Sequence, residues 1–140
     1  MKLADQLQRH LLAIISLVVA ITALSYNTYR NELSEENRTI RFAGFELLKE
    51  LNSLQLLIDY AHFDKDSVEG NPITGWGHVM YIKDMSRLIS TEVVGQADQL
   101  GEIWDEEWQA VQYDASSNQR VTIGIVQLRK LVRATVEQLM

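Results

Sequence analysis

The stretch that decides the fold is residues 34–62, SEENRTIRFAGFELLKELNSLQLLIDYAH. Apolar residues recur in it at spacings of three and four, which is the repeat of one face of a helix. The pattern predicts an amphipathic helix with a long buried stripe. The residues of this stripe are Ile40, Ala43, Leu47, Leu51, Leu54, Ile58 and Ala61.

Further apolar side chains lie beside the stripe. Phe45, Leu48, Leu56 and Leu57 widen it, so we expect the helix to be buried against more than one neighbour. Glu46, Lys49 and Glu50 predict a solvated face on the same helix.

Upstream of this helix, residues 11–26 read LLAIISLVVAITALSY and carry no charge. A helix of this length spans ~24 Å, and extension to residue 29 gives ~28 Å, close to the ~30 Å hydrocarbon layer of a bilayer. Tyr26 and Tyr29 then share one interface, and Arg9 and Arg30 bracket the span with side chains that reach the headgroups. We therefore predict a transmembrane anchor at residues 11–29.

Residues 11–29 have two alternative interpretations. A buried core helix can be equally apolar, but it rarely lacks a polar face over four turns. A cleaved signal peptide is the stronger alternative, because Ala23-Leu24-Ser25 has the small-x-small form of a cleavage site. The preceding residues are only weakly basic and include Asp5, so we expect a retained anchor.

The orientation of the anchor follows from its flanks. Lys2 and Arg9 precede it, whereas Arg30, Arg38 and Arg41 follow it, so the count of basic residues is nearly balanced. A short basic tail, residues 1–10, is expected to stay in the cytoplasm. Residues 30–140 would then lie outside the inner (cytoplasmic) membrane, in the periplasm of a Gram-negative bacterium.

Three more helices are expected after the first. They run from His78 to about Ile89, from Val94 to Gln112, and onward from residues 114–118, DASSN, where Ser116 or Ser117 would cap the start. Their apolar stripes are Val79, Ile82, Met85 or Ser86, and Ile89; then Ala97, Leu100, Trp104, Trp108 and Val111; then Val121, Ile125, Leu128, Val132, Val136 and Leu139. The prediction is an all-α chain, with one transmembrane helix followed by an up-down bundle of about four helices at residues 30–140.

Residues 62–78, HFDKDSVEGNPITGWGH, hold two of the three histidines and the only proline. His62, Asp64, Asp66 and His78 could share a zinc or nickel ion if the two helix ends meet. However, the second pair of a di-iron bundle and the remaining ligands of a calcium loop are missing. A simple helix connection, with a turn at Gly70-Asn71-Pro72, is favoured, and no metal is predicted.

Composition excludes several classes of function. The chain has no cysteine, which rules out disulfides and thiolate chemistry. Residues 59–114 carry twelve acids against three bases, and no basic patch occurs, so nucleic-acid binding is not expected. No catalytic motif or cofactor-binding pattern stands out, so we predict neither an enzyme nor a cofactor.

The acidic middle of the chain suggests a docking surface for a protein partner. We expect Phe63 and Trp76 to act as aromatic anchors, with Asp105, Glu106 and Glu107 as acids at the rim. Trp104 and Trp108 lie on the apolar stripe and are assigned to the core.

The sequence thus predicts a non-catalytic, single-pass membrane protein. Its expected role is that of an accessory or scaffolding subunit of a membrane-associated complex, in contact with the lipid bilayer and with a protein partner or further copies of itself. The alternative is a small exported bundle that senses a ligand or metal and signals through a partner.

Overall fold

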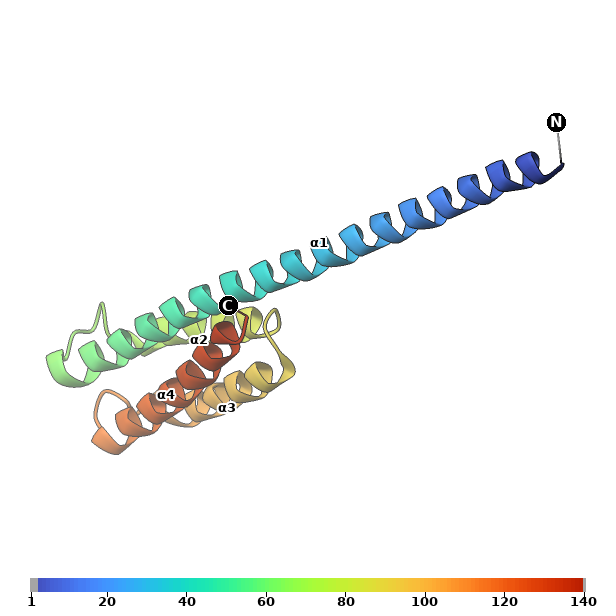
Figure 1. Cartoon of the computed structure of the whole chain (residues 1–140). Helices are drawn as coiled ribbons and strands as arrows, with labels where there is room; N and C mark the ends of the chain where they lie inside the picture. The colour runs from blue at the N-terminus through green and yellow to red at the C-terminus, as the bar shows by residue number, and fades with distance from the viewer. Residues whose placement is uncertain (1–2, 140) are drawn as a thin grey trace. The chain divides into compact units, whose positions relative to one another are not determined.

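The computed structural model describes residues 3–139, without the side chains of residues 3–5, 7 and 9. The helices are α1 (Leu3–Asp59), α2 (Pro72–Ser86), α3 (Thr91–Glu107) and α4 (Ala115–Glu137), and a π-helical turn, Tyr60–Asp64, follows α1 (Figure 1). Residues 3–139 contain no strand, so the all-α prediction is confirmed. The chain divides into two compact units, Met1–Asn37 and Arg38–Met140.

The first unit is the N-terminal part of α1. Its large apolar side chains from Leu11 to Tyr29 are each 50–68% exposed. One 18-residue window has a mean hydropathy of 1.9 and none of it is buried, so the helix is long and apolar enough to cross a membrane. A signal sequence would meet the same criterion of length and composition, whereas a buried core helix does not fit these exposures.

Polar side chains in this part of α1 bond to the helix itself. Thr22 Oγ1 donates to the carbonyl of Val18 at 2.8 Å, and Thr28 Oγ1 donates to the carbonyl of Leu24 at 3.0 Å. Both hydroxyl groups are therefore satisfied without water, which lowers the cost of placing them in an apolar medium.

The second unit has one core, made by the predicted stripes. Its buried side chains include Leu47, Leu51 and Leu54 of α1, Leu100 and Trp104 of α3, and Leu128 and Val132 of α4. Ile40, Trp108 and Met85 are partly buried against it. The 3.6-residue period thus identified the inward faces of α1, α3 and α4 correctly.

Contacts between α1 and its neighbours have a consistent register. Along α4, Asn118 Nδ2 donates to the carbonyl of Ile58 at 3.2 Å, whereas Val136 lies against Gly44. The start of α4 therefore lies near the end of α1, and the two helices run in opposite directions.

The other neighbouring pairs follow the same rule. Along α2, Gly75 lies against Trp104 of α3, and Lys83 pairs with Asp98 at 2.9 Å. Along α3 and α4, Glu107 pairs with Arg120, and Gln96 Nε2 donates to Gln127 Oε1 at 3.4 Å. In both helix pairs the residue number rises along one helix as it falls along the other, so neighbouring helices are antiparallel.

The start of α2 differs from the expectation at His78. Asn71 Oδ1 accepts from the backbone N–H of Ile73 at 3.0 Å, and Pro72 occupies the first turn. This cap and a proline whose fixed φ suits the first helical turn outweigh the low helix propensity of Gly75 and Gly77. Residues 72–77 are therefore helical, and the turn ends at Asn71.

The starts of α3 and α4 also differ from expectation. α3 begins at Thr91, three residues early, because Ser90 Oγ accepts from the N–H of Val93 at 3.2 Å. At α4, Asp114 caps the helix by accepting from the N–H of Ser116 at 3.0 Å, so the Ser116 or Ser117 cap was wrong. Ser117 instead donates to Asp114 Oδ2.

Two expectations about the surface of α1 were wrong. Phe45 is 60% exposed and Leu56 is 48% exposed, although Leu57 is buried. Glu50, expected in water, is half-buried because it pairs with His78 of α2. Part of the apolar surface of α1 therefore lies outside the core.

Candidate functional site

The connection between α1 and α2 is fixed by bonds within the loop. Asp66 Oδ1 accepts from the backbone N–H groups of Val68 and Glu69 at 2.8 and 3.0 Å. These two bonds stabilise the carboxylate and lower the pKa of Asp66. Gly70 lies against the backbone of Ala61, where a Cβ would be 2.3 Å from the Ala61 nitrogen. No larger residue fits there without a backbone shift.

The two histidines have separate partners. His62 Nδ1 donates to the carbonyl of Val111 at 3.2 Å, which ties the end of α1 to the connection after α3. His78 Nδ1 bonds to Glu50 Oε1 at 2.5 Å, between α2 and α1. Asp64 is exposed, and Asp66 faces its own loop. Within residues 3–139, no three of the potential ligands gather to hold a metal ion.

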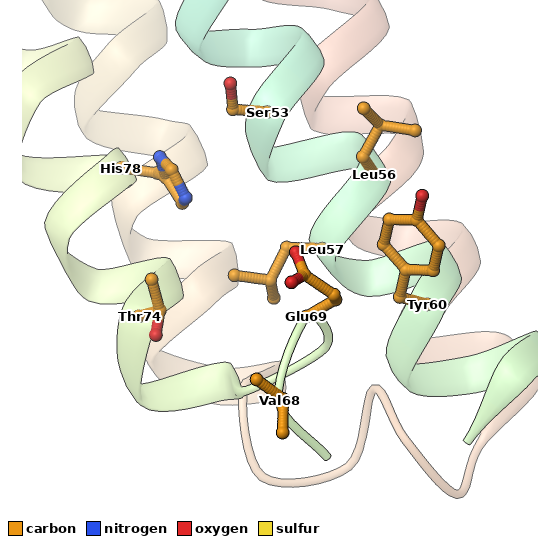
Figure 2. A pocket seen from close by; sticks show the side chains of 8 residues that line it. All are labelled: Ser53, Leu56, Leu57, Tyr60, Val68, Glu69, Thr74 and His78. Carbon is orange, nitrogen blue, oxygen red and sulfur yellow. The ribbon is translucent and has the colours of Figure 1, made fainter. Parts of the chain in front are cut away.

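A groove of about 300 Å³ lies between α1, the loop and α2 (Figure 2). Leu56, Leu57, Tyr60 and Val68 make its apolar part, and Ser53, Glu69, Thr74 and His78 add polar groups. The groove places a carboxylate and an imidazole beside an apolar wall, an arrangement that suits a small ligand with an apolar body and a polar end.

A second, more open groove of about 440 Å³ follows α2 and α3. Its lining consists of Trp76, Lys83, Asp98, Gly101, Glu102 and Asp105. Lys83 is bound to Asp98, so Glu102 and Asp105 give the groove an acidic character. A partner with basic side chains would complement it.

Trp76 is a core residue as much as a surface one. Its ring packs edge-to-face on Trp104, with centroids 6.5 Å apart, and on Trp108, with centroids 6.2 Å apart. Trp76 is half-buried, and its role as an aromatic anchor for a partner stays a prediction. Only its remaining edge lines the α2–α3 groove.

Phe63 matches the expectation of exposure. It is 70% exposed in the π-helical turn after α1, where its ring stands edge-on to His62 with centroids 4.8 Å apart. Its role as a partner contact stays a prediction.

The three acids at the end of α3 are not equivalent. Asp105 and Glu106 are exposed, as expected of a solvated face. Glu107 is buried and bonds through both carboxylate oxygens to Arg120 of α4, so its assignment to an exposed rim was wrong. The hydrogen bonds from Arg120 lower the pKa of Glu107.

The proposed membrane-interface residues lie along α1. Tyr26, Tyr29 and Arg30 are exposed, and the two tyrosines are three residues apart on one face of the helix. The side chain of Arg9 lies outside the described side chains.

Sequence reasoning missed the pairs Glu50–His78 and Glu107–Arg120. The members of each pair belong to different helices, and no local pattern joins them. It also missed that Phe42 and Phe45 stay exposed on α1, although a count of residues per helix turn would have separated them from the buried stripe.

No protein-family model matches this chain, and comparisons with curated proteins and with solved structures likewise gave no match.

Proposed function

We propose that the protein is a non-catalytic, single-pass membrane protein whose up-down helical bundle acts as an accessory or scaffolding subunit of a membrane-associated complex. Residues 11–29 would cross the inner membrane, and the bundle would lie on its periplasmic side. The observation that carries this proposal is the exposed apolar surface of residues 11–29, none of which belongs to the core formed by residues 43–136.

The size of that surface supports a membrane. The segment from Leu11 to Leu24 contains nine large aliphatic side chains, each at least half exposed. At ~1.5–3 kcal/mol for the burial of each such side chain, their transfer from water is worth on the order of 10 kcal/mol. A bilayer core supplies this burial, and the bonds of Thr22 and Thr28 to the helix reduce the opposing polar cost.

A role in contacts is supported by the second unit. The α2–α3 groove combines Trp76 with the carboxylates of Glu102 and Asp105, and Glu106, the next residue in the chain, is exposed. A basic protein segment would find both an apolar contact and opposite charge there. We therefore assign this groove as the partner-binding surface.

The test is a detergent pull-down of the full-length chain, with co-purifying proteins identified by mass spectrometry. Asp105→Lys combined with Glu106→Lys should release a stoichiometric partner, because both charges are reversed without touching the core. Asp84→Lys combined with Glu92→Lys makes the same charge change outside the groove and should retain the partner. Equal retention by both variants would contradict the assignment.

Two obvious substitutions are unsuitable for this test. Trp76→Ala removes contacts with Trp104 and Trp108 and should cost roughly 2–4 kcal/mol of stability. Reversal of Glu107 would set two positive charges side by side at Arg120. Loss of a partner by either variant would reflect damage to the fold.

The α1–α2 groove favours a second candidate function, that of a ligand sensor. Its mixture of apolar wall, carboxylate and imidazole is suited to a small amphiphilic molecule. A screen of such molecules by thermal melting should find one that stabilises the protein, and His78→Gln should weaken that effect. If no molecule in the screen stabilises the protein, the sensor function is contradicted.

A further inference from the structure

Five residues of α1 form a stripe directly opposite the core. Phe42, Phe45, Lys49, Asn52 and Leu56 follow one another at spacings of three and four, and we call them the outer stripe. Phe42, Phe45 and Leu56 are 62%, 60% and 48% exposed, and Lys49 and Asn52 are exposed too. Among residues 38–139, Leu56 also borders the α1–α2 groove, whereas Phe42 and Phe45 remain mostly exposed.

The spacing of the outer stripe is that of a coiled-coil seam. If Phe42, Lys49 and Leu56 take the first heptad position, Phe45 and Asn52 take the fourth. The fully buried Leu47 and Leu54 then take the sixth position, which points away from a seam. One helix can therefore serve the core and a second helix without a change in either packing.

We infer that the outer stripe pairs with the outer stripe of a second copy of this chain, as a parallel, in-register dimer. This inference rests on the proposed membrane anchor, because two copies anchored in one membrane send α1 out in the same direction. Lys49 would face its equivalent at a first heptad position, and a single polar residue at this position fixes the register at some cost in stability.

Charge complementarity supports a second copy as the occupant. In the same heptad phase, Arg41 takes the seventh position of one heptad and Glu46 takes the fifth position of the next. These are the positions that face each other across a parallel pair, so each dimer would gain two Arg41–Glu46 contacts. Glu46 is partly exposed at the edge of the stripe, where it binds Lys49 at 3.2 Å and accepts from the Tyr81 hydroxyl at 3.4 Å, and Arg41 of the second copy would add to these contacts.

Confinement to a membrane makes this short seam sufficient. A seam of about two heptads is weak in water, but a shared bilayer raises the effective concentration of the two copies. The dimer should therefore be found in the membrane-bound, full-length protein.

Cysteine cross-linking tests the inference directly, because the native chain has no cysteine. Asn52→Cys in the full-length protein should form a disulfide-linked dimer in membranes under mild oxidation. Asp84→Cys, at an exposed position of α2, is the matched control and should remain monomeric. Addition of Phe42→Ser and Phe45→Ser to Asn52→Cys should abolish the cross-link, whereas Ile73→Ser and Met80→Ser, which change exposed apolar residues of α2, should preserve it.

The outcomes separate the dimer from the anchor. Absence of a cross-link from Asn52→Cys, or equal cross-linking of Asp84→Cys, would overturn the dimer, as would a cross-link to a different protein. Alkaline carbonate extraction of the same membranes tests the anchor independently. Cross-linked protein that carbonate releases would support the dimer and contradict the anchor. Protein that stays in the pellet without a cross-link would support the anchor and contradict the dimer.

Discussion

Gly75 of α2 lies directly against the indole ring of Trp104 in α3. A Cβ at Gly75 would be 2.1 Å from Trp104 Cζ2 and 2.5 Å from Cη2. Trp104 is fully buried and packs against Trp76, so its ring has little freedom to move. The absence of a side chain at residue 75 is therefore what allows α2 and α3 to approach each other.

Gly75→Ala should destabilise the protein by about 1–3 kcal/mol or more, because the added methyl group overpacks the core. Gly77→Ala is the matched control. Apart from its two chain neighbours and the backbone of its own helix, no described atom lies within 4 Å of a Cβ at Gly77, so alanine there should stabilise the helix by roughly 0.5–1 kcal/mol. Urea unfolding of the two variants checks the difference, and equal effects would contradict the packing of α2 on Trp104.

Stability should fall as the pH drops below 4.5. Arg120 lowers the pKa of Glu107 below its ordinary value of 4.5, and backbone bonds lower the pKa of Asp66 and Asp114 below 3.8. In this window the unfolded chain binds more protons than the folded chain, so acid favours unfolding. The contribution of each group is present above its unfolded pKa and is lost as the pH falls through its folded pKa.

Glu107→Gln should reduce this pH dependence. The variant should be less stable than the native protein at pH 7, and the difference should shrink as the pH falls below 4.5. Denaturant unfolding at several pH values measures both quantities. A difference that stays constant down to pH 3 would show that the Glu107 carboxylate does not carry the effect.

The histidines should act as structural residues and not as metal ligands. His62→Gln with His78→Gln should lower the melting temperature modestly, because the bonds to Val111 and Glu50 are altered. The shift should be the same with and without added zinc or nickel. A stoichiometric metal in the purified native protein, lost in the double variant, would overturn this account.

The sequence was sufficient for the helices and their inward faces, because a 3.6-residue period is local information. Leu47, Leu51 and Leu54 could be assigned to the core from spacing alone. The predicted width of the buried stripe was wrong, because Phe45 is apolar and yet lies away from the core. An apolar residue can remain exposed, because its burial depends on how the other helices pack around it.

The early start of α2 had a readable signal. Asn71 before Pro72 is a typical helix start, but Gly75 and Gly77 have low helix propensity, and the packing of Gly75 on Trp104 cannot be read from the sequence. Glu50–His78 and Glu107–Arg120 had no such signal. Each depends on the register of two antiparallel helices, which no single segment specifies.

Orientation can be measured with a reporter enzyme joined after Met140. An enzyme that is active only outside the cytoplasm should be active in this fusion, because the short basic tail at residues 1–10 should remain inside. A second fusion to a reporter that is active only in the cytoplasm should be silent. The opposite pattern would reverse the proposed topology.

The central claim is that residues 11–29 form a retained membrane anchor. Alkaline carbonate extraction of membranes, followed by intact-mass measurement of the protein in the pellet, tests it most directly. We predict that the protein stays in the pellet with residues 11–29 attached. Protein released to the supernatant, or a mass that corresponds to cleavage near Ala23-Leu24-Ser25, would contradict the anchor.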